Sequence, residues 1–326
     1  MGASGQCRLV NNSAILRFPL FCDGFRCFMY ANLMLLAAAA IWGFGFVAQR
    51  LGMDYLPPFT FNGLRFLLGS LSLLPLIWIA RRQRAGQAQQ ASTDRATLLR
   101  GGLLAGGILF IAATFQQVGL QHTTAAKAGF ITGLYLILVP IFGLLLKHTT
   151  GITTWIGAVL AVIGLYLLSI NDDFSMSYGD GLQFCGALFW AIHILVIDHF
   201  SSRCAPIQLA ASQFVVCGLL SLVVGAALET PTLAGAVMAW KPLLYAGLVS
   251  VGVAYTLQVI GQRDANPAHA AIILSLESVF AVIGGVMLLD ETLSLRAWLG
   301  CGLMLAGMLL SQVRWGTPKT VATAAP

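Results

Sequence analysis

Charged residues are scarce in this sequence. Only 9% of its 326 residues are charged, whereas 58% are hydrophobic, and the mean hydropathy is +0.84. A soluble domain typically contains about 25% charged residues, because its surface faces water. This shortage argues against two soluble domains, which the length alone would allow, and against a nucleic-acid-binding protein or a disordered scaffold. The composition predicts an all-α integral membrane protein whose surroundings are the lipid bilayer.

The sequence also lacks the motifs of catalysis and of cofactor binding. It contains no GxSxG, HExxH, Walker or nucleotide-binding pattern, and its seven cysteines form no close CxxC pair. We therefore expect no catalytic residue, no cofactor and no metal site, and no built-in ATPase. An intramembrane enzyme, the alternative from a different functional class, would need paired carboxylates or a His/Glu cluster at one depth. One acid, Glu277, lies well inside an apolar run, with Asp198 at the end of another.

What the sequence has in abundance is long apolar runs. From Tyr30 onward they are about 20 residues long, which is enough to cross about 30 Å of hydrocarbon as a helix. Strands of a barrel would alternate polar and apolar residues, and these runs do not. The sequence predicts ten transmembrane helices, at residues 31–49, 59–80, 100–119, 124–146, 152–170, 180–199, 206–227, 242–261, 268–288 and 294–313.

The lysines and arginines predict the orientation of these helices. With the N-terminus inside, 13 of the 18 basic residues fall in cytoplasmic regions and 3 in external links, while Arg65 and Lys127 lie within spans. We therefore expect both termini in the cytoplasm, with tails at residues 1–28 and 314–326. Met29 is an alternative start, which would make residues 1–28 an extension of the gene model.

The two halves of the chain resemble each other. Three blocks match without gaps, at offsets of 148, 142 and 143 residues. The matched pairs include Trp42/Trp190, Pro58/Pro206, Phe66/Phe214, Gln116/Gln258, Gly119/Gly261, Leu134/Leu276, Trp155/Trp298 and Gly164/Gly307. Each half, 31–170 and 180–313, contains five predicted spans, and an odd number inverts the second half in the membrane. Inverted repeats are typical of secondary transporters, which bind substrate near the midplane between the halves.

Several segments carry a family resemblance. They are Leu64–Gly69 (LRFLLG), Ala125–Tyr135 (AAKAGFITGLY), Leu274–Phe280 (LSLESVF), Leu288–Leu293 (LLDETL) and Trp298–Gly300 (WLG). They resemble the EamA-like branch of the drug/metabolite transporter superfamily over residues 31–313. The resemblance implies two EamA-like five-helix repeats in a bacterial inner membrane and a carrier that typically exports amino acids or other small metabolites.

The sequence departs from the family pattern at two positions. Ser278 stands where the family often has proline, and Asp290 where it often has glycine. Without that proline, the usual helix kink beside Glu277 is not expected.

Ionisable residues inside a membrane are costly, so each is a candidate for function. Glu277 lies near mid-depth and would bind a substrate amine or exchange a proton; the alternative is a structural carboxylate bonded to neighbouring helices. Its repeat mate Tyr135 is a candidate lining residue or a packed aromatic. Arg65 is a substrate contact or a structural ion partner. Trp42 and Trp190 lie too deep to anchor at headgroups, so they line the cavity or pack helices.

Lys127 and His269 are predicted to lie near opposite membrane faces. As repeat mates they are candidates for gating or coupling, although Lys127 could instead extend its long side chain to the interface. His193 is interpreted as a satisfied buried imidazole, with a proton relay as the alternative. The buried glutamines Gln116, Gln117 and Gln258 are interpreted as bonds between helices, with cavity lining as the alternative.

We expect the partners to be a small-molecule substrate and the lipid bilayer, with protons as a candidate coupling ion and no nucleic acid. The sequence leaves a monomer and a homodimer open. A nucleotide-sugar or lipid-intermediate carrier of the same superfamily is the alternative substrate class. A wide basic cavity would favour it, but Arg65 and Lys127 are the only lysines or arginines that lie away from the ends of the spans.

Overall fold

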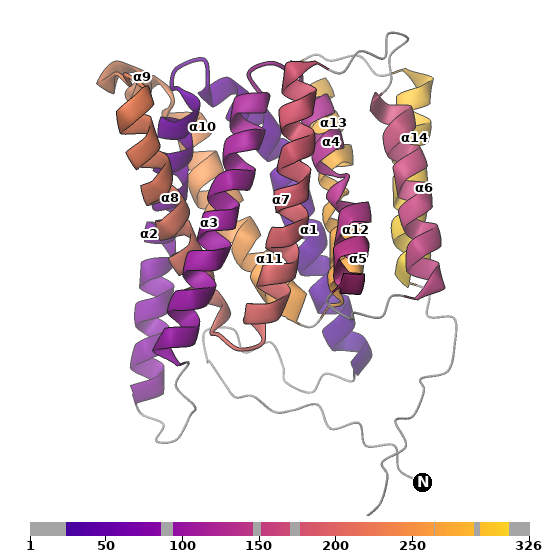
Figure 1. The fold of residues 1–326 in the computed structure, drawn as a ribbon, viewed down its shortest axis with the longest axis horizontal. Helices are drawn as coiled ribbons and strands as arrows, with labels where there is room; N and C mark the ends of the chain where they lie inside the picture. Colours follow the sequence, from indigo (N-terminus) through magenta and orange to yellow (C-terminus); the bar gives the residue numbers. More distant parts are fainter. Residues whose placement is uncertain are drawn as a thin grey trace, which may run out of the picture.

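The computed structural model describes residues 24–85, 94–145, 151–169, 177–263, 265–289 and 294–312, which form helices joined by short turns (Figure 1). No strand occurs in these ranges. The helices are α1 Gly24–Gly52, α2 Pro58–Ala85, α3 Arg95–Gly119, α4 Ala125–Thr132, α5 Tyr135–Leu145, α6 Ile152–Ser169, α7 Tyr178–Ser201, α8 Pro206–Leu228, α9 Leu233–Met238, α10 Trp240–Leu244, the π-helix η2 Tyr245–Tyr255, α11 Thr256–Arg263, α12 Pro267–Leu274, α13 Glu277–Leu289 and α14 Leu295–Gln312.

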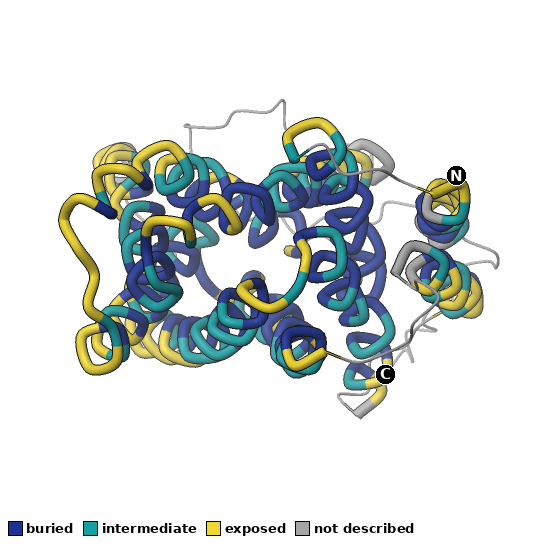
Figure 2. Tube along the Cα trace, turned by 90° about the horizontal axis from the view of Figure 1, so that it is seen from above, coloured by how far each residue is buried: buried dark blue, intermediate teal, exposed yellow. Residues whose placement is uncertain are grey.

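Within the described ranges, eight helical segments are long and apolar enough to cross a membrane, and shorter apolar stretches lie within α6 and α14. Large hydrophobic side chains such as Leu71, Val223 and Leu309 are exposed on the outer surface. Seen from above, exposed residues lie around the outside and buried ones face the interior (Figure 2). This is the distribution that a lipid environment favours, since hydrocarbon solvates apolar side chains. The chain is a multi-pass membrane protein.

Most predicted spans match a helix, but the ends differ. Helix α1 begins at Gly24, inside the predicted tail of residues 1–28, while residues 1–23 and 313–326 lie outside the described residues. The segment Leu288–Leu293 is described only up to Leu289. The short helix α9, Leu233–Met238, was not predicted, because six residues are too few to show a periodic pattern.

Two predicted spans are each divided into two helices. The span 124–146 consists of α4 and α5, separated at Gly133 and Leu134, and the span 268–288 consists of α12 and α13, separated at Ser275 and Leu276. The second break corrects the expectation that no kink would occur beside Glu277. Here the Ser275 hydroxyl donates to the carbonyl of Ile272 at 2.8 Å, so a side chain competes with the backbone where proline is absent.

The span predicted at 242–261 is continuous but unusual. It runs from α10 through the 11-residue π-helix η2 into α11. A π-helix is rare and is found mostly at functional sites. In this protein it faces α1 and α2, and it supplies Ser250 and Tyr255 to the protein interior.

The helices form a main bundle with a separate pair at one end. Helices α6 and α14 contact mainly each other, at the right of Figure 1 and of Figure 2. In the main bundle α2 packs against α8, α3 against α7 and α8, and α1 against α13, η2 and α11. The interior between these helices is therefore built from both halves of the chain.

A carboxylate at the end of α8 holds the start of α2. Glu229 accepts hydrogen bonds from the backbone N–H of Phe59 at 2.8 Å and from the N–H and hydroxyl of Thr60, both at 2.7 Å. The first N–H groups of a helix have no partner within it and favour negative charge. Glu229 thus joins α8 to the α2 N-terminus at one edge of the bundle.

Glycines allow the close approach of α6 and α14. A Cβ atom on Gly164 would lie 2.5 Å from the backbone oxygen of Gly300, and one on Gly307 would lie 2.6 Å from that of Gly157. Backbone cannot move aside as a flexible side chain can. Small residues at such contacts are typical of helix pairs in membranes.

We predict that Gly164→Val destabilises the folded protein by about 1–3 kcal/mol, the usual cost of forcing extra atoms into a packed contact. The melting temperature in detergent measures this effect. Gly302→Ala on α14 is the matched control, because nothing lies within 4 Å of the added Cβ. Equal melting temperatures of the two variants would contradict the close α6–α14 contact.

Candidate substrate cavity

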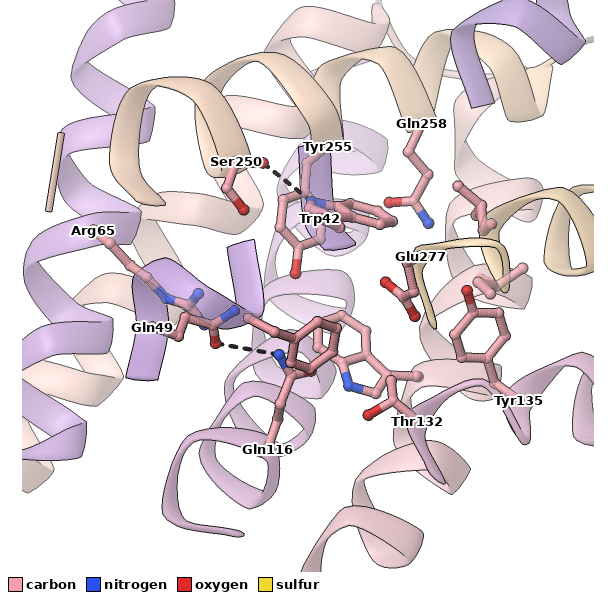
Figure 3. A pocket seen from close by; sticks show the side chains of 14 residues that line it. Trp42, Gln49, Arg65, Gln116, Thr132, Tyr135, Ser250, Tyr255, Gln258 and Glu277 are labelled. Atoms are coloured by element: carbon pink, nitrogen blue, oxygen red, sulfur yellow. Dashed lines mark hydrogen bonds between the residues drawn. The ribbon is translucent and has the colours of Figure 1, made fainter. Parts of the chain in front are cut away.

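A cavity lies in the main bundle, between helices of both halves (Figure 3). Its volume, counted as the space open to the centre of a water molecule, is about 30 Å³. One water needs about 10–15 Å³ by this measure, so the cavity can hold more than a single water. It is lined by Trp42, Phe46, Gln49, Arg65, Gln116, Thr132, Tyr135, Trp190, Ile194, Ser250, Tyr255, Gln258, Leu274 and Glu277.

The two helix breaks bring Glu277 and Tyr135 to this cavity. Glu277 is the first residue of α13 and Tyr135 the first of α5, so each stands at the N-terminus of a half-helix. A helix N-terminus carries partial positive charge, which favours a carboxylate at that position. Both side chains are buried and interact with each other, and among the described residues Glu277 Oε1 has no other hydrogen-bond partner. The pair therefore presents polar oxygens to whatever enters the cavity.

Arg65 brings a positive charge to the same cavity. Its side chain is only 3% exposed, and its guanidinium carbon lies 4.8 Å from the ring centre of Phe66 and 6.0 Å from that of Phe61. Such contacts with aromatic faces stabilise a cation in part. Within the described part of the chain Arg65 has no carboxylate partner, and its Nε has no acceptor. Figure 3 shows Arg65 and Glu277 on opposite sides of the cavity.

Aromatic rings form the wall between these charges. The Trp42 ring centre lies 4.6 Å from that of Tyr255, and Trp190 stacks on Tyr255 at 6.2 Å. The Trp42 Nε1–H donates to the backbone oxygen of Ser250 at 3.2 Å, which fixes the indole against the π-helix η2 (Figure 3). The structure thus places both predicted tryptophans on the cavity wall.

A chain of amide groups crosses the bundle beside the cavity. Gln116 Nε2 donates to Gln49 Oε1 at 3.2 Å, and Gln183 Nε2 donates to the backbone oxygen of Gln116 at 2.8 Å. The Thr132 hydroxyl donates to Gln183 Oε1 at 3.4 Å. These bonds join α1, α3, α4 and α7. From the sequence, Gln116 was predicted either to form hydrogen bonds between helices or to line the cavity. In the structure it forms such bonds and also lines the cavity.

Sequence reasoning did not find several lining residues. Gln49, Thr132, Ser250 and Tyr255 were not singled out, because a polar residue in an apolar run does not by itself indicate which face of its helix it occupies. Ser250 and Tyr255 lie in the π-helix η2, whose period differs from that of an α-helix, so their face of the helix could not be predicted from α-helical spacing. Glutamine at position 49, near the end of the first run, was the one signal that the sequence offered.

Lys127 and His269 do not line the cavity. Lys127 is half-buried near the start of α4, and His269 is buried near the start of α12, where its Nε2 lies 3.0 Å from Asn32 Oδ1 and its ring stacks on Phe28. In Figure 1, α4 and α12 lie toward opposite ends of the bundle. The structure therefore separates these two residues from Glu277 and Arg65, and their role in gating stays a prediction.

The described residues contain no group of three or more His, Cys, Asp or Glu side chains placed to hold a metal ion. The polar groups that line the cavity are one carboxyl group, one guanidinium, two phenols, two aliphatic hydroxyls, three amides and two indoles. These groups can bind a small polar molecule by charge and hydrogen bonds.

Comparison with known proteins identifies relatives along almost the whole chain. A transporter of Archaeoglobus fulgidus, named as uncharacterized, is 32% identical over 287 residues, which is 88% of this chain and 87% of that protein. The Escherichia coli inner membrane transporter YedA is 26% identical over 289 residues, 85% of this chain and 88% of YedA. The Bacillus subtilis transporter YoaV is 24% identical over 295 residues, 87% of this chain and 97% of YoaV. The names of all three are those of transporters, not of enzymes.

A solved protein structure has the same fold. It superposes with a TM-score of 0.69 at 18% identity, over 86% of this chain and 96% of the other. The sequence model of the EamA-like transporter family matches residues 29–170 and 177–312, which include all the cavity-lining residues. The resemblance seen in the sequence is confirmed, and the chain belongs to the EamA-like transporter family.

Proposed function

We propose that this protein is a secondary carrier that moves small metabolites with both an amine and a carboxylate group, such as amino acids, out of the cell. The observation that carries this proposal is the pairing of Glu277 and Arg65 across one cavity, each without an ionic partner among the described residues. A zwitterion would place its ammonium group at Glu277 and its carboxylate at Arg65. Aromatic rings between them would contact an apolar side chain.

Physical cost supports this proposal. A buried charge without a counter-ion is expensive in a membrane interior, and proteins keep such residues where they have a function. Arg65 and Glu277 do not neutralise each other, because they stand on opposite sides of the cavity (Figure 3). A substrate that binds both would offset both costs at once. Export is proposed from the family resemblance, and location in an inner membrane from the name of the E. coli relative.

Alternating access is proposed to use the two inverted five-helix repeats, 31–170 and 180–313. The bounds of two helices support the repeat. Helix α6 spans Ile152–Ser169 and α14 spans Leu295–Gln312; both are 18 residues long, and each bound of α14 is 143 positions after the matching bound of α6. The half-helix α5 begins at Tyr135 and α13 at Glu277, an offset of 142 that agrees with the sequence match. Discontinuous helices that end at a central site are a feature of transporters with inverted repeats.

We predict that Glu277→Gln lowers substrate flux in reconstituted vesicles at least about tenfold, equivalent to about 1.4 kcal/mol of binding or barrier energy. Glutamine keeps the size and the hydrogen-bonding ability of the side chain but cannot pair with an ammonium group. The measurement is uptake and efflux of a tritiated amino-acid mixture. Asp54→Asn, at an exposed carboxylate between α1 and α2, is the matched control and should transport normally. Wild-type flux in Glu277→Gln would remove this residue from the mechanism.

We predict that Arg65→Gln selectively weakens binding of ligands that carry a carboxylate, by about 2 kcal/mol or roughly 30-fold, because a buried charge pair is lost. The melting temperature of purified protein reports binding. It is measured with each amino acid and with the amine that lacks its carboxylate. The wild type should separate the members of each pair and Arg65→Gln should not. A variant that still separates them would show that the carboxylate binds elsewhere.

We predict ten membrane crossings with both termini in the cytoplasm. Single cysteines introduced at Arg95, the first residue of α3, and at Asp173, in the link before α7, should then react with impermeant maleimide from opposite sides of the membrane. Asp173 lies outside the described residues, and its position is a prediction from charge. Labelling of both cysteines from the same side would contradict the inverted repeat.

A further inference from the structure

A second group of buried polar side chains lies at the junction of α7, α8 and α11. His193 on α7 is fully buried, and its Nε2 lies 2.8 Å from Gln213 Oε1 on α8. Gln262 on α11 donates to the backbone oxygen of Ile194 at 3.2 Å, directly beside His193 in the chain. Neither His193 nor Gln262 lines the cavity described above. The junction is therefore a separate feature, although it lies next to the cavity.

The orientation of the Gln213 amide, whose oxygen faces His193 Nε2, assigns the hydrogen of the neutral imidazole to that nitrogen. An amide oxygen only accepts, so Nε2 must donate and the neutral imidazole keeps its lone pair on Nδ1. Among the described residues Nδ1 has no hydrogen-bond partner. A buried nitrogen with a free lone pair is a proton acceptor that is available for use.

The junction contains further polar atoms in the same condition. Gln213 Nε2, Gln262 Oε1 and Gln258 Oε1 are buried and lack a partner within the described chain. Gln258 and Gln262 are four residues apart on α11 and therefore lie on one face of it. Gln258 lines the cavity, whereas Gln262 is next to Arg263, the last residue of α11. The unpartnered atoms thus extend from the cavity toward one end of the bundle.

His193 is also connected to the cavity wall through its ring. It meets Trp190 edge-on at 5.9 Å and Tyr255 edge-on at 6.2 Å, and both of these rings line the cavity. A positive charge on the imidazole would therefore stand directly behind the surface that contacts substrate.

A buried polar group without a hydrogen-bond partner destabilises the fold. Where the protein provides no partner, an ordered water molecule usually does. The junction offers three acceptors, His193 Nδ1, Gln258 Oε1 and Gln262 Oε1, and one donor, Gln213 Nε2. Water can donate to the first three and accept from the fourth. Apolar ligands fit none of these atoms, and an ion of either sign fits only some of them.

We propose that the α7–α8–α11 junction is a hydrated proton-acceptor site, in which water links Gln262 and Gln258 to His193 Nδ1. Protons reach it from the membrane face where α11 ends. His193 Nδ1 accepts a proton that this water relays from the membrane face, which forms an imidazolium and leaves the water neutral. The imidazolium returns the proton to the water later in the cycle, so the neutral imidazole is regenerated. Because the added charge lies behind Trp190 and Tyr255, proton binding and substrate binding become linked. This inference rests on the proposed carrier function.

Other titratable or charged groups face this junction from the surrounding helices. Tyr255 reaches it from η2, and Cys217 lies on α8 one turn from Gln213. Arg65, from α2, lies next to Tyr255 and Cys217. Tyr135 and Glu277 lie on the other side of the cavity. In α3, α4 and α12 the titratable groups lie near the helix starts, at Arg95, Arg100, Lys127 and His269. Glu277 is a second proton acceptor, so the test must separate it from His193.

The test compares two modes of transport in vesicles that contain the full-length protein. The probe is a tritiated amino-acid mixture. Counterflow exchanges labelled for unlabelled substrate at equal pH and needs no net proton movement, whereas net flux is measured with an imposed pH difference. We expect His193→Gln to keep counterflow and to lose the response of net flux to the pH difference. Glutamine can still bond to Gln213 and water but cannot hold a proton.

His122→Gln, which removes an exposed histidine beside Tyr178, is the matched control and should keep both modes. A retained pH response in His193→Gln, or no pH response in a wild type that performs counterflow, would overturn the proton site while leaving the carrier function intact. Failure of wild-type counterflow would overturn the carrier function itself. Loss of counterflow only in Glu277→Gln would assign substrate binding to that carboxylate and support separate roles for the two residues.

A spectroscopic measurement tests the site without transport. In protein labelled with ¹⁵N-histidine, the His193→Gln spectrum identifies the His193 signals by subtraction. We expect hydrogen on Nε2 and a lone pair on Nδ1 that is hydrogen-bonded to exchangeable water. The opposite neutral tautomer, with hydrogen on Nδ1 and the lone pair on Nε2, would overturn the proposal.

Discussion

Separation of a buried carboxyl group from a buried guanidinium group is the constraint on which this structure depends. Glu277 and Arg65 would attract each other strongly at short range in a low-dielectric interior, and a direct ion pair would close the cavity. The fold prevents this by holding each charge on a different helix with its own local support. Glu277 stands at the N-terminus of α13, and Arg65 lies against the rings of Phe61 and Phe66. Each group is thereby stabilised in part but keeps an atom without a hydrogen-bond partner, Glu277 Oε1 and Arg65 Nε, which a ligand could bind.

The helix breaks are needed for the same reason. Each break places a cavity side chain, Tyr135 or Glu277, at the first residue of a half-helix. The N–H groups that follow bond back across the break, that of Leu136 to Gly133 and that of Ser278 to Ser275, so the breaks contribute through side-chain position. The breaks before Tyr135 and Glu277 occur at Gly133 and Ser275. Neither residue is proline. Ser278 uses its hydroxyl to donate to the backbone oxygen of Gly129 on α4 at 2.5 Å, so it joins the two broken spans to each other.

The sequence predicted the parts of this design that depend on composition and depth. Low charge and run length gave the membrane class, and the rarity of ionisable residues in lipid singled out Glu277 and Arg65 before their positions were known. Depth does not reveal helix face, however, so it did not indicate that Gln49 and Thr132 line the cavity. Lys127 and His269 were predicted near opposite membrane faces as gates; both lie outside the cavity, and that role stays a prediction. Neither the π-helix nor the bond from Gln183 to Gln116 has a local sequence signal, because both arise from packing between distant segments.

The proposed repeat also explains why the cavity is not symmetric. Trp42 and Trp190 are equivalent in the two halves, as are Gln116 and Gln258, and these pairs form the walls. Each charge, by contrast, has a neutral mate: Tyr135 for Glu277, and Gln213 for Arg65. Two symmetric carboxylates would repel each other across a small cavity, and each would add its own desolvation cost. One acid and one base, taken from different pairs, give a bound zwitterion a single orientation. In the proposed alternating-access cycle, such a ligand would keep this orientation while the cavity opens first to one side of the membrane and then to the other.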